Sequence, residues 1–231
     1  MNVTLCSAFR NSCGYLDRYL SRATDLYLSL SERGDRLHCV WGEGDSTDET
    51  LERLTWAYTY ARWAITIVDC THGGADYPSI VIEERWKQLA HVGRCIWAAI
   101  PTDADAVVYV ESDIVWQAQT LVTLIDRLTD YPAVSPMIML ERKGWPVGSF
   151  YDTFVFRKDG KHFGHHPPYH PCYRPDQPFM VDSAGSVMAL RGDVARGLQF
   201  DEQTIFTDLC QQIYANGGSV HVDPRCRVTH Y

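Results

Sequence analysis

Two acidic residues stand where an apolar run ends. Residues 107–110 are Val, Val, Tyr and Val, and Glu111, Ser112 and Asp113 follow them. Residues at i and i+2 of a strand share a face, and both carboxylates can turn toward one divalent cation where the strand opens into a loop. Carboxylate oxygens suit Mn²⁺ or Mg²⁺. An acidic triplet also arises by chance at the polar end of a strand, so the interpretation depends on its surroundings.

Two further segments could contribute to such a site. Residues 43–50 are small and acidic, so the backbone can approach a ligand closely and Glu43 can accept hydrogen bonds from a base or ribose. The same residues could equally begin a helix, with Ser46 or Thr47 as its cap. His230 could offer a neutral imidazole to the cation held by Asp113, although histidines beside a terminus are often frayed.

The apolar pattern predicts the elements that must position these residues. Strands are expected over residues 3–9, 37–41, 64–68, 106–110 and 133–140, and helices over residues 15–31, 48–62, 80–100 and 117–129. Strands that alternate with helices in this way predict an α/β fold with a mixed, mainly parallel sheet flanked by helices. Ligands of such sheets bind beyond the carboxyl ends of the strands, here the loops after Phe9, Trp41 and Val110.

Residues 141–179 break the pattern. They are rich in Pro, Gly, aromatic residues and histidine, including His165, His166 and His170. A long irregular segment is usually a lid or a binding loop, so we expect it to receive an acceptor.

Composition restricts the class of protein. The formal net charge of −8 argues against a large basic surface for nucleic acid. No apolar run approaches the length of a membrane span, and no signal peptide is visible. The 8 cysteines form no CxxC pair, which favours a reducing compartment. We therefore expect a cytoplasmic protein with one domain over residues 1–231.

Five segments together resemble the GT-A glycosyltransferases. They are the first strand with Phe9, Arg10 and Asn11; residues 43–50; Glu111, Ser112 and Asp113; residues 182–186; and residues 228–231. Within that fold the chain is similar to glycosyltransferase family 62, the fungal Golgi α-mannosyltransferases of the mannan polymerase type, over residues 84–115, 181–186, 190–194 and 230–231. The family has Asp-Ala-Asp in place of Glu111, Ser112 and Asp113, is longer, and carries a membrane anchor. These departures point away from a Golgi mannan role and toward a bacterial or viral enzyme.

The resemblance implies a GT-A (Rossmann-like) fold and a metal-dependent hexosyltransferase that uses a GDP- or UDP-linked sugar. Residues 1–116 would bind the nucleotide sugar and residues 117–231 the acceptor. Mn²⁺ or Mg²⁺ would neutralise the leaving diphosphate, with Asp113, Glu111 and His230 as its ligands.

The resemblance also implies roles for individual residues. Ser7, Ala8, Phe9 and Arg10 would border the base, Glu43 the nucleoside, Arg85 and Arg94 the diphosphate or donor sugar, and Glu111 and Ser112 the donor. Asp182 would be a catalytic residue that contacts the sugar or acceptor. Asp208 would be the general base if the enzyme inverts configuration; a retaining enzyme, as in family 62, needs no such base.

The acceptor and two other functions stay open. The acceptor could be a glycan, a protein or a modified nucleobase in DNA, the last disfavoured by the acidic charge. A nucleotidyltransferase acting on a sugar phosphate could use a similar sheet and metal, but it would usually have a basic, Gly-rich loop after the first strand. A non-catalytic module that binds nucleotide sugars or glycans would be expected to lack the carboxylates.

Overall fold

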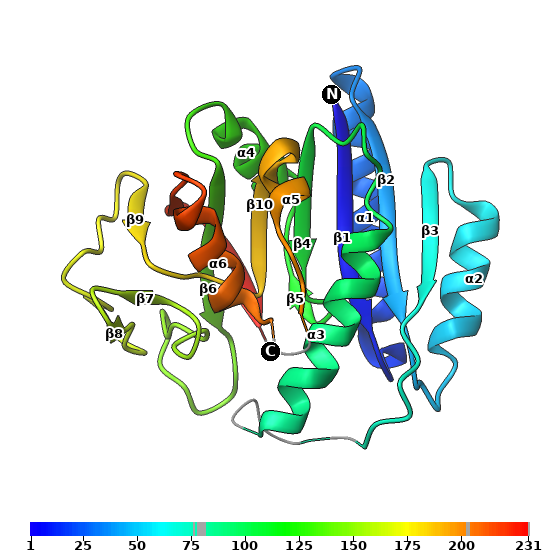
Figure 1. The fold of residues 1–231 in the computed structure, drawn as a ribbon, viewed down its shortest axis with the longest axis horizontal. Coiled ribbons are helices and arrows are strands. Elements are labelled where there is room, and N and C mark those ends of the chain that lie inside the picture. The colour runs from blue at the N-terminus through cyan, green and yellow to red at the C-terminus, as the bar shows by residue number, and fades with distance from the viewer. Residues whose placement is uncertain (76, 78–81, 202–203, 231) are drawn as a thin grey trace.

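The computed structural model describes residues 1–75, 77, 82–201 and 204–230. One nine-stranded sheet runs through them, with β9 attached beside β11 (Figure 1). Its strands are β1 (Asn2–Phe9), β2 (Arg36–Glu43), β3 (Ala64–Asp69), β4 (Ala106–Val110), β5 (Ile114–Val115), β6 (Ala133–Leu140), β9 (Phe179–Val181), β10 (Val187–Arg191) and β11 (Val220–His230). Their order across the sheet is β3-β2-β1-β4-β10-β6-β11-β5.

The first half of the sheet is parallel. β1 pairs in parallel with both β2 and β4, and β2 pairs in parallel with β3. All five residues of β4 are buried, as expected of a central strand covered by helices on both faces. The carboxyl ends of β1, β2 and β4 therefore lie at the same edge of the sheet.

The second half is mixed. β10 runs antiparallel to β4 and β6, while β11 is parallel to β6 and antiparallel to β5 and β9. Our sequence interpretation did not identify β5, β9, β10 or β11 as strands, because they are short or interrupted by polar residues and a proline. β11 returns the end of the chain to the edge where β4 ends, and it is the element that positions His230.

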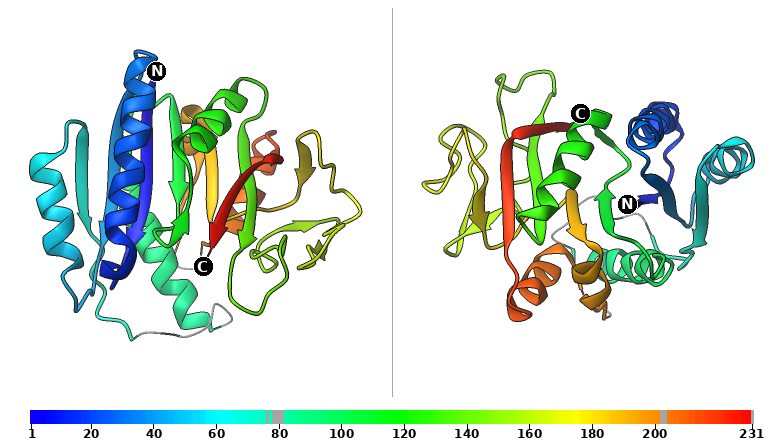
Figure 2. Two further views of the ribbon diagram at one scale, coloured as in Figure 1. Left: turned by 180° about the vertical axis from the view of Figure 1, so that it is seen from behind. Right: turned by 90° about the horizontal axis from the view of Figure 1, so that it is seen from above.

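Helices cover both faces of the sheet (Figure 2). α1 (Cys13–Glu32) and α4 (Ala118–Asp126) lie on one face, and α3 (Glu83–Ala98), α5 (Gly192–Gly197) and α6 (Phe206–Ala215) lie on the other. α2 (Thr50–Tyr60) covers the edge beside β3, and a single 3₁₀ turn, η1 (Arg127–Thr129), follows α4. The predicted mainly parallel sheet flanked by helices is confirmed. None of the helices within the described residues is long and apolar enough to cross a membrane.

The predicted starts of two helices, α2 and α3, can be compared with the structure. The helix expected from residue 48 begins at Thr50, and neither Ser46 nor Thr47 caps it, so that expectation was wrong. Ser46 Oγ instead accepts a hydrogen bond from the Asn11 amide at 3.0 Å, which ties this loop to the loop after β1. The helix expected from residue 80 is seen from Glu83 onward; residues 80 and 81 lie outside the described residues.

The segment over residues 141–179 is largely irregular, as predicted, and its buried aromatic side chains belong to the main hydrophobic core. Within this segment, β7 (Arg157–Lys158) and β8 (Lys161–His162) pair as a small antiparallel hairpin. Phe150, Phe156 and Phe163 are buried and in ring contact, with centroids 4.9 to 5.8 Å apart. Aromatic packing of this kind contributes stability beyond the area that it buries, so these residues form a fixed wall of the molecule.

A buried carboxylate fixes an irregularity in β11. The register of β11 against β6 shifts between Asp223 and Arg227. The side chain of Asp223 is fully buried and accepts hydrogen bonds from Arg127 Nε at 3.0 Å and from the Arg225 guanidinium at 2.6 Å. Burial alone would raise the pKa of Asp223, but the hydrogen bonds from Arg225 and Arg127 outweigh it and hold the pKa below its usual value.

We expect Asp223→Ala to lower the free energy of unfolding by about 1–3 kcal/mol, the cost of losing charge-assisted hydrogen bonds whose arginine partners can still reach water. Because the folded-state pKa is depressed, this contribution is present above the unfolded pKa of about 3.9 and is lost as the pH falls through the folded value. Urea unfolding at pH 7 and pH 3 measures both effects. An equal difference between wild type and variant at the two pH values would contradict the account.

Candidate active site

A cleft of about 600 Å³ opens at the edge of the sheet where β1, β2 and β4 end. Its walls come from the loops after these strands, from α3, from the segment after β6 and from the loop before β10. The polar residues and tyrosines that line it include Arg10, Asn11, Tyr15, His72, Tyr77, Arg85, Gln88, Tyr109, Glu111, Ser112, Asp113, Tyr151, Asp152, Thr153 and Ser186. The cleft thus lies at the edge of the sheet that the order of elements predicts.

Asp113, which lines the cleft, lies beside His230 although 117 positions separate them; His230 itself is not one of the lining residues. β5 begins directly after Asp113, and His230 lies opposite Ile114 in the antiparallel pair of β5 and β11. His230 Nε2 is 3.2 Å from Asp113 Oδ2. The imidazole stacks on the Tyr151 ring with centroids 3.8 Å apart and planes 9° apart, so its orientation is fixed by packing.

The donor atoms of this pair fit a divalent cation. Two neighbouring ligands of an octahedral cation, each about 2.1 Å from it, lie about 3 Å apart, which is close to the distance between Asp113 Oδ2 and His230 Nε2. Among the described residues no cluster of three or more His, Cys, Asp or Glu side chains forms a complete metal site. Asp113 and His230 alone would leave most coordination positions free. Cations such as Mg²⁺ typically use one or two carboxylates and complete their coordination with substrate phosphates and water.

Acidic groups crowd the floor of the cleft. Loss of hydration, together with the nearby charges of Asp113 and Asp152, raises the pKa of Glu111 to about 8. Burial raises the pKa of Asp152 to about 6, and a hydrogen bond from Ser186 opposes the rise. Carboxyl groups that repel one another with little water around them are stabilised by a bound cation or a proton, so the electrostatics favour a cation at this place.

The loops after β1, β2 and β3 are joined into one surface. Asn11 Oδ1 accepts a hydrogen bond from the Thr47 amide at 2.8 Å. Asp45 has a φ of 59° and lies 2.6 Å from His72 Nδ1, and backbone hydrogen bonds from His72 and Gly73 lower the pKa of Asp45. A Cβ at Gly44 would lie 2.5 Å from the Cys70 carbonyl carbon, so only glycine allows these two loops to touch.

The residues predicted to bind the nucleotide-sugar donor divide into those that line the cleft and those that do not. The first group is Ala8, Phe9, Arg10, Arg85, Glu111, Ser112 and Asp113. Ser7 does not line the cleft: this residue is buried between β1 and β4, and its Oγ lies 2.6 Å from both the Val110 carbonyl and the Tyr19 hydroxyl. Glu43 is also buried beneath the cleft, where it accepts a hydrogen bond from the Ser46 amide at 3.3 Å.

Arg94 lies apart from the cleft. It borders a separate hollow of about 290 Å³ together with Trp97, Arg196 and Phe200, and its guanidinium is 3.4 Å from His91 Nδ1. Arg94 follows Arg85 by 9 residues, which is two and a half turns of α3, so the two side chains leave the helix on different sides. Of these two arginines, only Arg85 is placed to meet a ligand in the cleft.

The two candidate catalytic carboxylates also lie outside the lining of the cleft. Asp182 is 3.1 Å from Lys158 Nζ and accepts a hydrogen bond from the Gly160 amide. Asp208 Oδ2 accepts a hydrogen bond from the Ile205 amide at 2.9 Å and so caps the first turn of α6. Both carboxylates therefore have structural partners where they stand.

Asp152, Tyr151 and Ser186 line the cleft; our sequence interpretation included them only as parts of the segments 141–179 and 182–186 and gave none of them a role of its own. Residues 150–152 carry no recognisable motif. They are positioned by a return of the chain alongside β6, where Met139 bridges to Phe150 and the Tyr151 amide donates to the Ile138 carbonyl at 2.8 Å. No short-range sequence signal indicates such a return.

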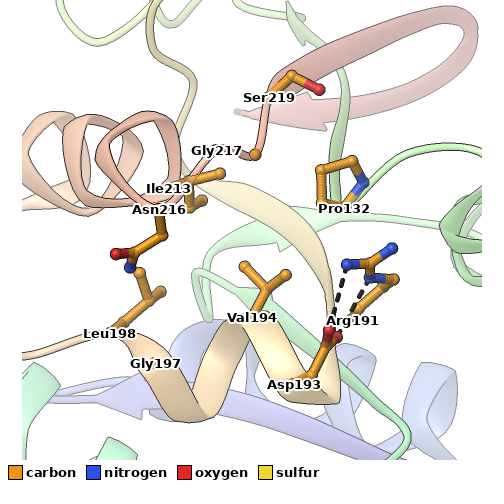
Figure 3. Close-up of a pocket in the computed structure, with 11 residues that line it drawn as sticks. Pro132, Arg191, Asp193, Val194, Gly197, Leu198, Ile213, Asn216, Gly217 and Ser219 are labelled. Atoms are coloured by element: carbon orange, nitrogen blue, oxygen red, sulfur yellow. Dashed lines mark hydrogen bonds and ion pairs between the residues drawn. The ribbon is translucent and has the colours of Figure 1, made fainter.

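A larger hollow of about 670 Å³ lies at the other edge of the sheet, where β10 ends and β6 and β11 begin (Figure 3). Arg191 and Asp193 pair with each other across its border at 3.1 Å. The remaining lining is glycine, proline, small polar and aliphatic residues. Because its charges are already paired, the hollow offers little for catalysis, and the cleft at the carboxyl ends is the candidate active site.

Solved structures with the same arrangement of elements bind nucleotide sugars. TarS residues 1–349 from S. aureus superposes with a TM-score of 0.61 at 13% identity, covering 100% of this chain and 60% of that one; it has also been solved with UDP-GlcNAc. The mannosyltransferase PcManGT from Pyrobaculum calidifontis, in complex with GDP-Man and Mn²⁺, gives a TM-score of 0.60 at 16% identity over 99% of this chain and 56% of that one.

The chain has a GT-A fold. Its structural neighbours are GT-A-like nucleotide-sugar glycosyltransferases, and it spans about 60% or less of the length of the two described above. No protein-family model matches the sequence, and no curated protein matches it. The cleft lies at the carboxyl ends of β1, β2 and β4, which is where ligands of a mainly parallel sheet bind.

Proposed function

We propose that the protein is a metal-dependent glycosyltransferase, which moves a sugar from a UDP- or GDP-linked donor to a hydroxyl group of an acceptor. The observation that carries this proposal is that Asp113, which lines the cleft beyond β1, β2 and β4, lies 3.2 Å from His230. A neutral imidazole and a carboxylate beside a cleft of nucleotide-sugar size form an open site for Mn²⁺ or Mg²⁺.

Each part of the donor has a suitable wall in the cleft. The base would lie against Phe9 and Arg10 near the joined loops of Asn11 and His72. Arg85, whose guanidinium also donates to the Tyr77 carbonyl, would meet the diphosphate, since a planar guanidinium recognises phosphate oxygens in pairs. When bound, the cation would supply positive charge to the leaving diphosphate.

The acceptor would bind at the side of the cleft formed by the second half of the chain. Residues 117–231 contribute Tyr151, Asp152 and Thr153 to the wall of the cleft near Asp113 and His230. A glycan, a protein side chain or a flipped base are all candidates for this side, and the net charge of −8 disfavours DNA. Similarity to family 62 would make the donor GDP-mannose, one of the sugars to be tested.

A thermal-shift screen of UDP-, GDP-, CMP- and dTDP-sugars, with and without Mn²⁺, tests the proposal, because a ligand that binds only the native state raises the melting temperature. We expect one nucleotide class to raise it in Mn²⁺ and much less with EDTA present. Release of the nucleoside diphosphate under the same conditions separates an enzyme from a binding module. A shift by nucleoside triphosphates with pyrophosphate release would instead identify a nucleotidyltransferase.

A further inference from the structure

Asp152 is a carboxylate held in one orientation at the wall of the cleft. It is 6% exposed, and its Oδ2 accepts a hydrogen bond from Ser186 Oγ at 2.8 Å. The Val155 amide also stabilises its ionised form, and the Asp152 carbonyl accepts the Phe156 amide at 3.2 Å. A carboxylate has about four acceptor positions, so room for another hydrogen bond remains on a side chain that is already oriented.

Asp152 lies beside Asp113 and His230, the two residues proposed to hold the cation, but it is not one of the proposed ligands. The preceding residue, Tyr151, stacks on His230, and Ser186 joins Asp152 to β4, since the Glu111 amide donates to the Ser186 carbonyl at 2.9 Å. Among the residues that the structure describes, the acidic ones that line the cleft are Glu111, Asp113 and Asp152. The first two stand at the end of β4, on the side proposed for the cation and the diphosphate, so Asp152 is the acid on the side proposed for the acceptor.

We propose that Asp152 is the general base of sugar transfer and that the reaction inverts configuration; this rests on the proposed function above. The acceptor oxygen forms a bond to the anomeric carbon while the bond from that carbon to the diphosphate oxygen breaks, and its electron pair leaves with the diphosphate. The hydroxyl proton passes to the carboxylate of Asp152. A single displacement from the face opposite the leaving group yields the inverted anomer.

The ionisation of Asp152 is consistent with that role. Burial raises its pKa to about 6, so near neutral pH the group is largely ionised and is a stronger base than an exposed carboxylate. The charged and titratable groups described around it are Glu111 and Asp113 after β4, Arg85 on α3, His230 on β11, and Tyr151.

The test compares Asp152→Asn with Asp208→Asn, and Asp193→Asn serves as a control at the other edge of the sheet. UDP-GlcNAc or GDP-mannose, whichever binds the wild type in Mn²⁺, is the donor, water is the acceptor, and release of the nucleoside diphosphate is the measurement. We expect Asp152→Asn to lower turnover by about 10²- to 10⁴-fold with donor Kd near wild type. Asp208→Asn should lose much less, and Asp193→Asn should match wild type.

Azide distinguishes a base from a residue that only supports the structure. Azide carries no proton to be removed, so it should restore turnover of Asp152→Asn, and of Asp152→Ala if the amide variant folds poorly, while adding little to wild type. The product should be the glycosyl azide with configuration opposite to the donor, as read by NMR. A melting temperature and donor Kd near wild type exclude misfolding as the cause of the loss.

The inference would be overturned by turnover of Asp152→Asn within about tenfold of wild type, or by a product that retains the donor configuration. An azide-rescued loss in Asp208→Asn equal to that in Asp152→Asn would also overturn it. If wild type neither binds nor cleaves any nucleotide sugar, the proposed function itself fails. That result is seen before any variant is compared.

Discussion

Replacement of Asp113 by Asn is expected to lower donor cleavage and sugar transfer by about 10³-fold or more. Asparagine keeps the shape of the side chain but removes the negative charge that would hold the cation beside His230. A bound divalent cation stabilises the charge that develops on a leaving group by several kcal/mol, and each factor of ten in rate corresponds to about 1.4 kcal/mol. Release of nucleoside diphosphate at saturating donor and Mn²⁺ measures the loss.

The matched control for this variant is Asp193→Asn. Asp193 also stands near a strand end, pairs with Arg191 at 3.1 Å, and lies at the far edge of the sheet from the cleft. We expect it to keep wild-type activity and a similar melting temperature. Activity of Asp113→Asn comparable to that of Asp193→Asn, in enzyme stripped with a chelator and reconstituted with Mn²⁺, would remove the proposed metal role.

His230→Gln is expected to have the second largest effect, of a different kind. The variant loses the imidazole that stacks on Tyr151 and faces Asp113, so the Mn²⁺ concentration needed for half-maximal activity should rise about 10- to 100-fold. Because Asp113 remains, much of the maximal rate should return at high Mn²⁺. A loss of rate that no Mn²⁺ concentration restores would contradict a role in holding the cation.

His221→Gln is a close control, because it changes another histidine of the same strand. His221 lies near the start of β11, its ring centroid is 4.2 Å from that of Tyr131, and burial lowers its pKa. It is therefore a stacked, half-buried imidazole with no access to the cleft. We expect His221→Gln to lower the melting temperature slightly and leave the Mn²⁺ dependence unchanged.

The part of the fold predictable from sequence was the part with uninterrupted periodicity. The strands now called β1, β2, β3, β4 and β6 and the helices α1 to α4 follow from apolar spacing, because each buries one continuous face or run. β11 was missed since Asp223, Pro224 and Arg225 interrupt its pattern, and the buried Asp223 is stabilised in part by Arg127, which is 96 positions away in the sequence. Long-range pairing decides such strands.

The candidate site was predictable where the chain delivers residues directly from a strand. Glu111 and Asp113 follow β4, and Arg10 follows β1, so their place at one sheet edge follows from parallel pairing. Arg94 and Arg85 were predicted together, but a helix turns side chains through about 100° per residue, so Arg85 lines the cleft and Arg94 borders a separate hollow. Asp152 could not be found from sequence, since its position depends on a chain return beside β6 that carries no motif.

Calorimetric titration of UDP and of GDP into the protein, with Mn²⁺ and then with EDTA, tests the central claim most directly. We expect one of the two nucleotides to bind in Mn²⁺, with affinity that falls by about tenfold or more with EDTA or in Asp113→Asn and stays unchanged in Asp193→Asn. Nucleotide binding of equal strength with and without the metal, or in Asp113→Asn and wild type, would contradict a cation held by Asp113 and His230.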